Sequence, residues 1–285
     1  MRVGYLGPAG TYSEEALRAS APPGVEEVPC GSVWDTVMAV QDGLVDRAVV
    51  PIENALEGGV AATLDALAGE ADRVRIAGEV VHPIHHCLVA AAGIPLAEIT
   101  RVVSHPQASA QCARFLREHL PRADRVTAPS TADAVMKVRN GDGTTAALGS
   151  RLAAELYGCH VLAENVEDRP DNVTRFVWLA PAGETSAPGP DAKTSIVFWG
   201  AGDESPGWLV EVLRQFADRG VNLTRIESRP RRVRLGHYMF FADLDGAAER
   251  PPVREALEAL RSRVEEIRVL GSYPAATGES AQAPG

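Results

Sequence analysis

A stretch rich in proline, glycine, serine and alanine at residues 182–191 constrains the fold of this chain more than any other feature. Such a composition is typical of an interdomain linker, because it favours turns and extended backbone over helix and strand. The sequence patterns before and after this stretch also differ. We therefore expect two domains, at residues 1–181 and 192–273, followed by a disordered tail at residues 274–285.

The first domain alternates between short apolar segments and amphipathic helical patterns. Residues 2–6 are typical of a buried strand, and Thr11 follows a glycine turn and begins a helix. Residues 80–91 are apolar enough for one central strand, and a proline begins a helix at residues 106–120. This alternation predicts an α/β domain with a mostly parallel sheet, in two lobes around a cleft.

The second domain has a different order of elements. We predict strands at residues 193–199, 221–227, 237–244 and 267–271, and helices at residues 206–219 and 252–264. This βαββαβ order is the ferredoxin-like split arrangement.

The composition argues against several classes of protein. With 45% hydrophobic residues the chain should be soluble and globular, and its net charge of −10 argues against nucleic-acid or anionic-membrane partners. The N-terminal apolar run is too short for a signal peptide, and no run of about 18 apolar residues could span a membrane. The four cysteines lie far apart, which favours reduced thiols. We therefore expect a cytoplasmic protein.

The sequence gives little support for a cofactor. The glycine turn after the first strand lacks the G-x-G-x-x-G order of dinucleotide-binding folds. His82, His85 and His86 lie beside Cys87 and could suggest a metal site. On a strand, however, His85 and His86 point to opposite faces, and no carboxylate lies nearby in the sequence. We interpret these histidines as packed or surface residues and expect no metal or organic cofactor.

Polar residues at the ends of predicted strands are the candidates for a site. Residues 169–180 run from a polar loop into an apolar strand, with Asn172, Thr174 and Arg175 at its mouth. Open α/β sheets place ligand-contacting groups at such ends. The same local pattern also fits an ordinary strand entry with solvated polar groups.

Two further strand ends have the same character. Glu53 and Asn54 end an apolar strand, and two glycines precede the next helix. Ser104 ends another strand, and Gln107 and Gln111 follow it on one face of a proline-started helix. These side chains could meet at a common cleft.

Several separated motifs, in the same order, resemble prephenate dehydratase, an enzyme of phenylalanine biosynthesis. The resemblance spans nearly all of residues 1–273 and rests on residues 5–13, 51–54, 104–107, 111–112, 147–150, 172–176 and 227–230. It implies a two-lobed, periplasmic-binding-protein-like catalytic domain followed by a regulatory ACT domain.

The resemblance also implies a set of site residues. The expected catalytic residues are Thr174, Glu53, Asn54, Ser104 and Gln111. The expected substrate-binding residues are Arg175, Gln107, Phe176, Thr11, Ser130 and Thr131. Ser130 and Thr131 also fit a helix cap with Asp133.

The implied reaction removes carbon dioxide and water from prephenate and gives phenylpyruvate, as a carbon–oxygen lyase without a cofactor. A hydrogen-bond donor at the departing hydroxyl would accelerate this step. We assign donation or relay to Thr174, with a neighbouring carboxyl such as Glu53 as one proton source. Arg175 would hold the pyruvyl carboxylate of the substrate or would bridge the two lobes.

Other functions remain open at this stage. Arogenate dehydratase, prephenate decarboxylase and a non-catalytic phenylalanine sensor all fit parts of the pattern. A decarboxylase that keeps the hydroxyl would lack the donor, and a sensor would not need Thr174. A solute-binding protein would need a secretion signal.

The regulatory part departs from the family pattern. Phenylalanine is the expected effector, bound between ACT domains by Gly207, Trp208, Leu209 and Val210 and by Glu227, Ser228, Arg229 and Pro230. Trp208 stands where the family usually has a small alanine, and Ala55 stands where it often has a serine. The indole would fill the effector pocket and weaken the response, or would point away and pack on the neighbouring helix. We expect a homodimer or homotetramer.

Overall fold

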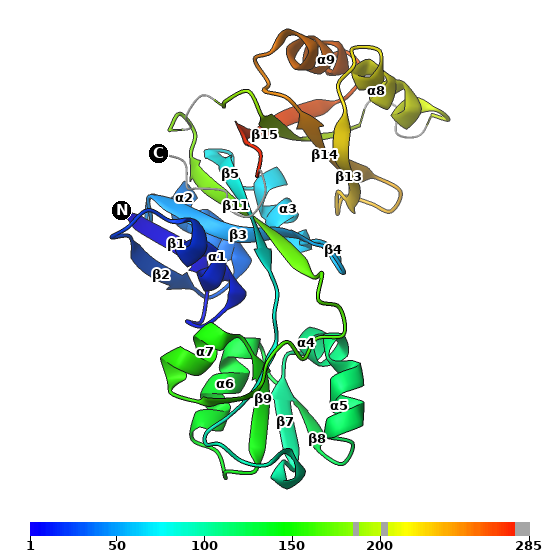
Figure 1. The fold of residues 1–285 in the computed structure, drawn as a ribbon. Coiled ribbons are helices and arrows are strands. Elements are labelled where there is room, and N and C mark those ends of the chain that lie inside the picture. The colour runs from blue at the N-terminus through cyan, green and yellow to red at the C-terminus, as the bar shows by residue number, and fades with distance from the viewer. Residues whose placement is uncertain (185–187, 201–204, 277–285) are drawn as a thin grey trace.

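The computed structural model describes residues 1–184, 188–200 and 205–276 and contains three β-sheets. Figure 1 shows the first sheet in the middle of the molecule, the second at one end and the third at the other. Residues 185–187 of the predicted linker and residues 277–285 of the predicted tail lie outside the described residues.

The first lobe is built on a sheet of order β2-β1-β3-β11-β5, with β4 paired to β3. Its strands are β1 (Arg2–Leu6), β2 (Glu26–Cys30), β3 (Arg47–Asn54), β4 (Gly58–Gly59), β5 (Val74–Pro83) and β11 (Val173–Pro181). Its helices are α1 (Tyr12–Ser20), α2 (Val33–Gln41) and α3 (Ala61–Ala68). Strand β11 lies antiparallel between β3 and β5, so the chain returns to the centre of this sheet after it has built the second lobe.

The second lobe is built on a sheet of order β10-β6-β9-β7-β8. Its strands are β6 (Cys87–Ala90), β7 (Arg101–Ser104), β8 (Asp124–Thr127), β9 (Thr145–Gly149) and β10 (His160–Ala163). Its helices are the short 3-10 helix η1 (Leu96–Glu98), α4 (Pro106–Gln111), α5 (Ala113–His119), α6 (Thr131–Arg139) and α7 (Arg151–Tyr157). Two segments connect the lobes, one between β5 and β6 and one between β10 and β11 (Figure 1).

Three expectations from the sequence are wrong in detail. Both sheets are mixed rather than mostly parallel, because β11 and β6 each pair antiparallel with both neighbours. The predicted strand at residues 80–91 is two strands in different lobes, since apolar character alone does not reveal where a chain leaves one sheet for another. The predicted helix at residues 106–120 breaks at Cys112.

The third sheet has the order β13-β14-β12-β15 and is antiparallel throughout. Its elements are β12 (Ala192–Trp199), α8 (Trp208–Ala217), β13 (Leu223–Pro230), β14 (Tyr238–Asp245), α9 (Pro251–Arg261) and β15 (Glu266–Pro274). The predicted βαββαβ order is therefore confirmed.

The two faces of the third sheet have different partners. One face packs under α8 and α9, with Phe198 and Val212 in a shared core. The opposite face joins the core of the first lobe, where Val197 and Phe241 lie in one cluster with Ile76. The third sheet is thus fixed to the back of the sheet that carries β3 and β11.

Within the described residues, no helix combines the length and the apolar character that crossing a membrane requires.

Candidate functional site

A cavity of about 450 Å³ opens between the two lobes. The ends of strands β3 and β11 of the first lobe border this cavity, and so do the N-termini of α1, α4 and α6. Most of the predicted catalytic and substrate-binding residues line it: Asn54, Gln111, Thr174, Gln107, Phe176, Thr11, Ser130 and Thr131. The topology thus brings together residues that lie up to 165 positions apart in the sequence, from Thr11 to Phe176.

Thr174 and Asn54 form a directly bonded pair in the cavity wall. They lie opposite each other in the pairing of β11 with β3. The Asn54 amide donates from Nδ2 to Oγ1 of Thr174 at 2.9 Å, and its Oδ1 accepts from the backbone N–H of Leu56 and Glu57. Because Oγ1 of Thr174 acts as the acceptor, its own proton remains available for a group in the cavity.

Gln111 connects three parts of the molecule across the cavity. Its Oε1 accepts from Nε2 of His86 at 2.9 Å and from Nδ2 of Asn172 at 3.3 Å. Its Nε2 donates to Oε1 of Glu57 at 3.4 Å. Gln111 belongs to the second lobe, Glu57 to the first, and His86 and Asn172 to the connecting segments. Gln111 therefore links the two lobes and both connecting segments.

His86 is a neutral hydrogen-bonding group in this arrangement. Since Oε1 of Gln111 can only accept, Nε2 of His86 carries the proton. Nδ1 of His86 lies 2.7 Å from the Tyr12 hydroxyl, which is also 2.8 Å from the carbonyl oxygen of His85. Burial lowers the pKa of His86 below its ordinary value, whereas the hydrogen bond to Gln111 opposes that shift. Burial raises the pKa of the Tyr12 phenol well above its ordinary value.

Arg175 does not reach the cavity, contrary to its predicted place in the substrate-binding set. Successive side chains of a strand point to opposite faces, so Thr174 and Phe176 face the cavity and Arg175 faces away. Its guanidinium contacts Glu79 of the first lobe and Asp243 and Tyr273 of the third sheet. Arg175 does act as a bridge, which was the alternative interpretation of this residue from the sequence. It bridges the first lobe and the third sheet, however, and not the two lobes.

Glu53 and Ser104 also lie outside the cavity. Glu53 precedes Asn54 on β3 and therefore points to the far face, where its carboxylate meets Arg175 at 3.3 Å. Ser104 is buried in the sheet of the second lobe, and its hydroxyl donates to the carbonyl oxygen of Leu148 at 3.4 Å. Neither position fits direct contact with a ligand in the cavity.

The cavity is electrostatically unusual for an anion site. Among the described residues, no arginine or lysine lines it, and its one carboxylate is that of Glu57. Positive potential comes instead from the N-termini of α1 and α6. The cap residue of α1, Thr11, makes no side-chain cap bond, whereas Ser130 caps α6 by accepting from the N–H of Asp133. The helix cap expected at Ser130 is therefore present, at the edge of the cavity.

Sequence reasoning missed five polar residues that line the cavity: Tyr12, Ser13, Glu57, His86 and His105. Tyr12 lies inside the motif at residues 5–13, and Glu57 lies shortly after the motif at residues 51–54, so proximity in the sequence could have found them. His105 lies inside one of those motifs and accepts from the N–H of Gln107. His86 was interpreted as a packed residue because the connection between the lobes was taken for a strand.

The predicted effector turn lines a second, smaller cavity, of about 200 Å³. Gly207, Trp208, Leu209 and Val210 contribute to it, together with residues of β14. The Trp208 indole packs on Phe198 and Phe240 and donates from Nε1 to the carbonyl oxygen of Arg263 at 2.8 Å. Trp208 therefore both lines this cavity and packs inside its own domain.

The second half of the predicted effector site, residues 227–230, does not line this smaller cavity. Residues of β13 alternate between the face toward the first lobe and the face toward the helices. Glu227 lies against Gly59, and Arg229 pairs with Asp65 of α3 at 2.9 Å. Within one chain, Glu227 and Arg229 thus contact the first lobe, and Ser228 and Pro230 remain exposed on the helix side.

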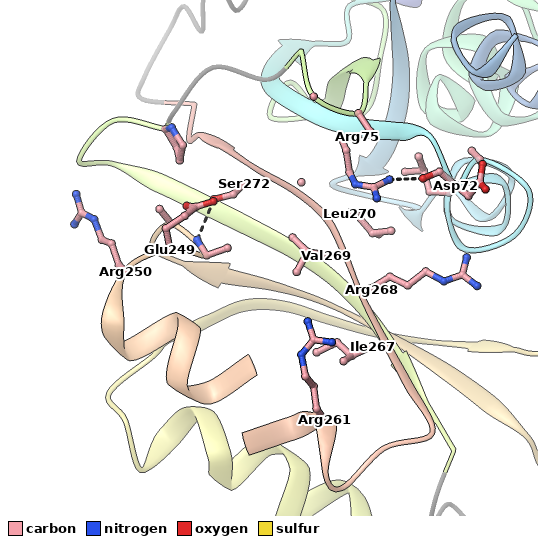
Figure 2. A pocket seen from close by; sticks show the side chains of 18 of the residues that line it. Asp72, Arg75, Glu249, Arg250, Arg261, Ile267, Arg268, Val269, Leu270 and Ser272 are labelled. Atoms are coloured by element: carbon pink, nitrogen blue, oxygen red, sulfur yellow. Dashed lines mark hydrogen bonds between the residues drawn. The ribbon is translucent and has the colours of Figure 1, made fainter. Parts of the chain in front are cut away.

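A larger groove, of about 1300 Å³, lies where the first lobe meets the third sheet (Figure 2). Arg261 comes from α9, Arg268 from β15 and Arg75 from β5. Arg75 donates to the backbone carbonyls of Asp72 and Val74, each at 2.7 Å. None of the predicted site residues lines this groove. The smaller inter-lobe cavity therefore remains the candidate active site.

The fold and the cavity define a two-lobed, periplasmic-binding-protein-like α/β enzyme with a small C-terminal regulatory domain. The family model described as prephenate dehydratase matches residues 3–184, and the ACT domain model matches residues 194–262. The chain belongs to the prephenate dehydratase family. It catalyses the carbon–oxygen lyase reaction from prephenate to phenylpyruvate in phenylalanine biosynthesis and carries an ACT regulatory domain. These findings confirm the family and the activity expected from the sequence.

Individual proteins support this assignment. A prephenate dehydratase of Mycobacterium tuberculosis is 38% identical over 293 residues, which cover 100% of this chain and 90% of that protein. Arogenate dehydratase 1 of Petunia hybrida is 40% identical over 291 residues, covering 96% of this chain and 67% of that protein. The structure of a prephenate dehydratase from Arthrobacter aurescens in complex with L-Phe has a TM-score of 0.88 at 43% identity, covering 96% and 90%.

Proposed function

We propose that prephenate binds in the cavity between the lobes and that Thr174 donates its hydroxyl proton toward the departing hydroxyl group. The observation that carries this proposal is the Asn54–Thr174 hydrogen bond, which makes Oγ1 an acceptor and leaves its proton for the cavity. A donor whose hydrogen bond strengthens as charge develops on the leaving oxygen accelerates the step. Aromatisation of the ring supplies the thermodynamic drive.

The reaction also needs a proton for the water that leaves. Glu57 is better situated for this task than Glu53, because its carboxyl lines the cavity and Glu53 is committed to Arg175. We therefore assign Glu57 as the carboxyl that supplies or relays the proton, through Thr174 or directly. Neutral Gln111 holds Glu57 in position with the 3.4 Å hydrogen bond.

The two carboxylates of prephenate would be held without a cationic side chain. The N-termini of α1 and α6 supply backbone N–H groups and positive potential, and Thr11, Ser130 and Thr131 add hydroxyls. Such moderate donors suit a substrate that must lose one carboxylate as carbon dioxide, since a full cation would stabilise the ground state more than the transition state. Asn54, Gln107 and Gln111 would orient the remaining oxygens, with Phe176 against the ring.

The proposal also includes the enzyme's preference between prephenate and arogenate as its substrate. Arogenate carries an ammonium group where prephenate has a keto group, and Glu57, the one carboxyl in the described cavity lining, is neutral in its role as the proton source and then offers that ammonium no counter-charge. We propose prephenate as the preferred substrate. Purified protein incubated separately with each compound should release phenylpyruvate faster than phenylalanine. The opposite order of kcat/KM would overturn this preference.

We further propose that L-phenylalanine is the effector and that it acts through the ACT domain at residues 192–273, separate from the catalytic domain at residues 1–181. The Arthrobacter aurescens relative was solved with L-Phe, and the turn at Gly207 has a cavity beside it. Cytoplasmic location is part of the same proposal. The free cysteines of the described chain suit a reducing compartment.

A further inference from the structure

The side of the active-site strands that faces away from the cavity carries a buried ionic cluster. Arg175 stands at its centre, with a side chain only 10% exposed. It donates to Oε2 of Glu79 at 2.5 Å, to Oδ2 of Asp243 at 2.5 Å and to the Tyr273 hydroxyl at 2.8 Å. Its Nη1 also meets Oε2 of Glu53 at 3.3 Å. One guanidinium thus joins two strands of the first lobe to two strands of the ACT sheet.

The ACT side of this cluster is itself held in place. The Ser195 hydroxyl lies 2.5 Å from Oδ1 of Asp243 and 2.7 Å from the hydroxyl of Tyr273. Burial would raise the pKa of Asp243, but Arg175 and Ser195 hold it below its ordinary value. Burial would lower the pKa of Arg175, yet Tyr273, Asp243 and Glu79 raise it well above its ordinary value. Arg175 and Asp243 are therefore both charged in the folded protein.

The cluster lies directly behind the proposed catalytic pair. In the pairing of β11 with β3, Arg175 faces Glu53, and the next pair along is Thr174 with Asn54. The two pairs share a backbone but point to opposite faces. A displacement of Arg175 or Glu53 therefore moves the backbone that carries Thr174 and Asn54. A shift of about 1 Å in a catalytic group is enough to cost up to roughly a hundredfold in rate.

Strand β13 of the ACT domain reaches the same wall of the cavity. Arg225 lies 3.7 Å from the Glu53 carboxylate and also contacts Glu227. The Glu227 carboxylate lies so close to Gly59 that a Cβ at this position would overlap it. Gly59 in turn lines the cavity. The strand that carries the proposed effector motif is thus in contact with the back of the active site within one chain.

We propose that Arg175 and Glu53 are positioning residues through which the ACT domain holds the Thr174–Asn54 pair, with Asp243 as the anchor on the ACT side. A movement of the ACT sheet then shifts the Thr174–Asn54 pair through the Arg175 guanidinium and the Glu53 carboxylate. This inference rests on the proposed role of Thr174.

The test begins with Asp243→Asn, which removes the anchoring charge and keeps the size of the side chain. We expect kcat to fall about tenfold with KM changed less than about twofold, because the pair is displaced while the rest of the cavity is intact. Asp245→Asn is the matched control, since Asp245 lies two residues along the same strand and, among the described residues, its carboxylate accepts a hydrogen bond from Asn222 of the ACT domain. This control should keep the activity of the unmodified protein.

A double-mutant cycle separates positioning from general loss of structure. If Asp243 acts through Thr174, the Asp243→Asn change should cost less than about twofold in a Thr174→Ala background. Equal losses in both backgrounds would overturn the inference, although a large loss from Thr174→Ala would still support the role of Thr174. A small loss from Thr174→Ala would instead refute the proposed function itself.

If the Asp243→Asn protein fails to fold, a milder variant, Tyr273→Phe, tests the same inference. Tyr273→Phe removes one hydroxyl that bonds Arg175 and keeps every charge of the cluster. We expect a three- to fivefold loss of kcat, about the effect of one ordinary intramolecular hydrogen bond, and again no such loss in the Thr174→Ala background. Unchanged kcat in Tyr273→Phe, with an unfolded Asp243→Asn protein, would count against the inference.

Discussion

At the scale of single residues, the site depends on a threonine hydroxyl whose hydrogen-bonding direction is set by its neighbour. Asn54 donates to Thr174, and three acceptors surround that one amide: Asn172, Val173 and Thr174. Burial of Thr174 makes this arrangement more effective, because a dipole aimed at a developing charge acts more strongly where water is scarce. A weak acid such as a threonine can therefore assist a poor leaving group without giving up its proton outright.

Replacement of Thr174 by alanine should reduce kcat by about a hundredfold or more and change KM little, because the hydrogen bond matters chiefly in the transition state. Steady-state kinetics with prephenate would measure both constants. Thr174→Ser is the control, since it keeps the hydroxyl, and it should lose less than about tenfold. A Thr174→Ala protein that retains most of its turnover would contradict the assignment.

At the scale of elements, the connection between β5 and β6 does more than join the lobes. It contains His86, whose imidazole bonds Tyr12 of α1 and Gln111 of α4 and whose backbone N–H donates to the Glu167 carboxylate at 2.9 Å. One short segment thus ties an element of each lobe to the edge of the cavity. The stability of this connection between the lobes should therefore depend on whether the His86 imidazole is neutral.

The pH dependence follows from the lowered pKa of His86. Above pH of about 6.5 the imidazole is neutral in both folded and unfolded chains, so it has no effect on the pH dependence. As the pH falls below about 6.5, the unfolded chain takes up a proton more readily than the folded one, and the free energy of unfolding decreases. Thermal melting at pH 8.0 and pH 5.5 would measure this loss.

His86→Gln is the matched variant for this measurement, since it cannot titrate. Its melting temperature should fall less between the two pH values than that of the unmodified protein. Tyr12 and Gln111 contact the imidazole, and the charged or titratable groups near it are Glu167, His85 and Glu15; all of these residues remain in both proteins. Equal pH dependence of the two proteins would exclude His86 as the source.

The N-terminus of α8 is the second element whose sequence departs from the family pattern. Trp208 packs on Phe198 and Phe240 and also forms a wall of the cavity of about 200 Å³. We expect weak inhibition of the unmodified enzyme by phenylalanine. Trp208→Ala should strengthen it by about ten- to a hundredfold, as expected when an overpacked site is relieved. Inhibition curves would measure this change.

The same variant should lose stability, by about 3 kcal/mol, because a large aromatic side chain leaves the ACT core. Trp34→Ala is the control, because Trp34 is half-exposed on α2 of the first lobe and should alter neither inhibition nor the effector cavity. Strong inhibition of the unmodified enzyme at micromolar phenylalanine would show that the indole is no obstacle.

At the scale of the whole molecule, strand β13 has two exposed features that suit a second copy of the chain. Within the part of the chain that the structure describes, β13 is an edge strand of the ACT sheet and pairs along one side, with β14. Apolar side chains are also exposed around it, among them Ile226 at 46%, Tyr238 at 41% and Val210 of α8 at 60%. An exposed edge with apolar neighbours favours pairing between two ACT domains.

We expect a homodimer or homotetramer, in which light scattering at micromolar concentration gives at least twice the chain mass of 30.3 kDa. Ile226→Glu should weaken the assembly, because it places a charge in the apolar edge. Val126→Glu, an equally exposed position on β8 of the second lobe, is the control and should leave the mass unchanged. A stable monomer of the unmodified protein would contradict this expectation.

The sequence predicted most elements because their signals are local. Ser32, Ser130 and Ser150 each accept a hydrogen bond from the third residue of the helix that follows, as capping patterns indicate. The edge strands β2 and β8 were missed, since they are short and largely exposed and therefore lack a strong apolar pattern. Motif order likewise identified the family without any knowledge of pairing.

By itself the sequence determined the order of elements, the division into a catalytic and a regulatory part, and the motifs from which the cavity is built. Only the tertiary structure decided which residues of those motifs face the cavity. Thr174 and Arg175 are adjacent, as are Asn54 and Glu53, yet strand geometry sends one of each pair to the substrate side and the other to the ACT domain. The physical reason is that a strand has two faces, and what covers each face depends on chain segments far away in the sequence.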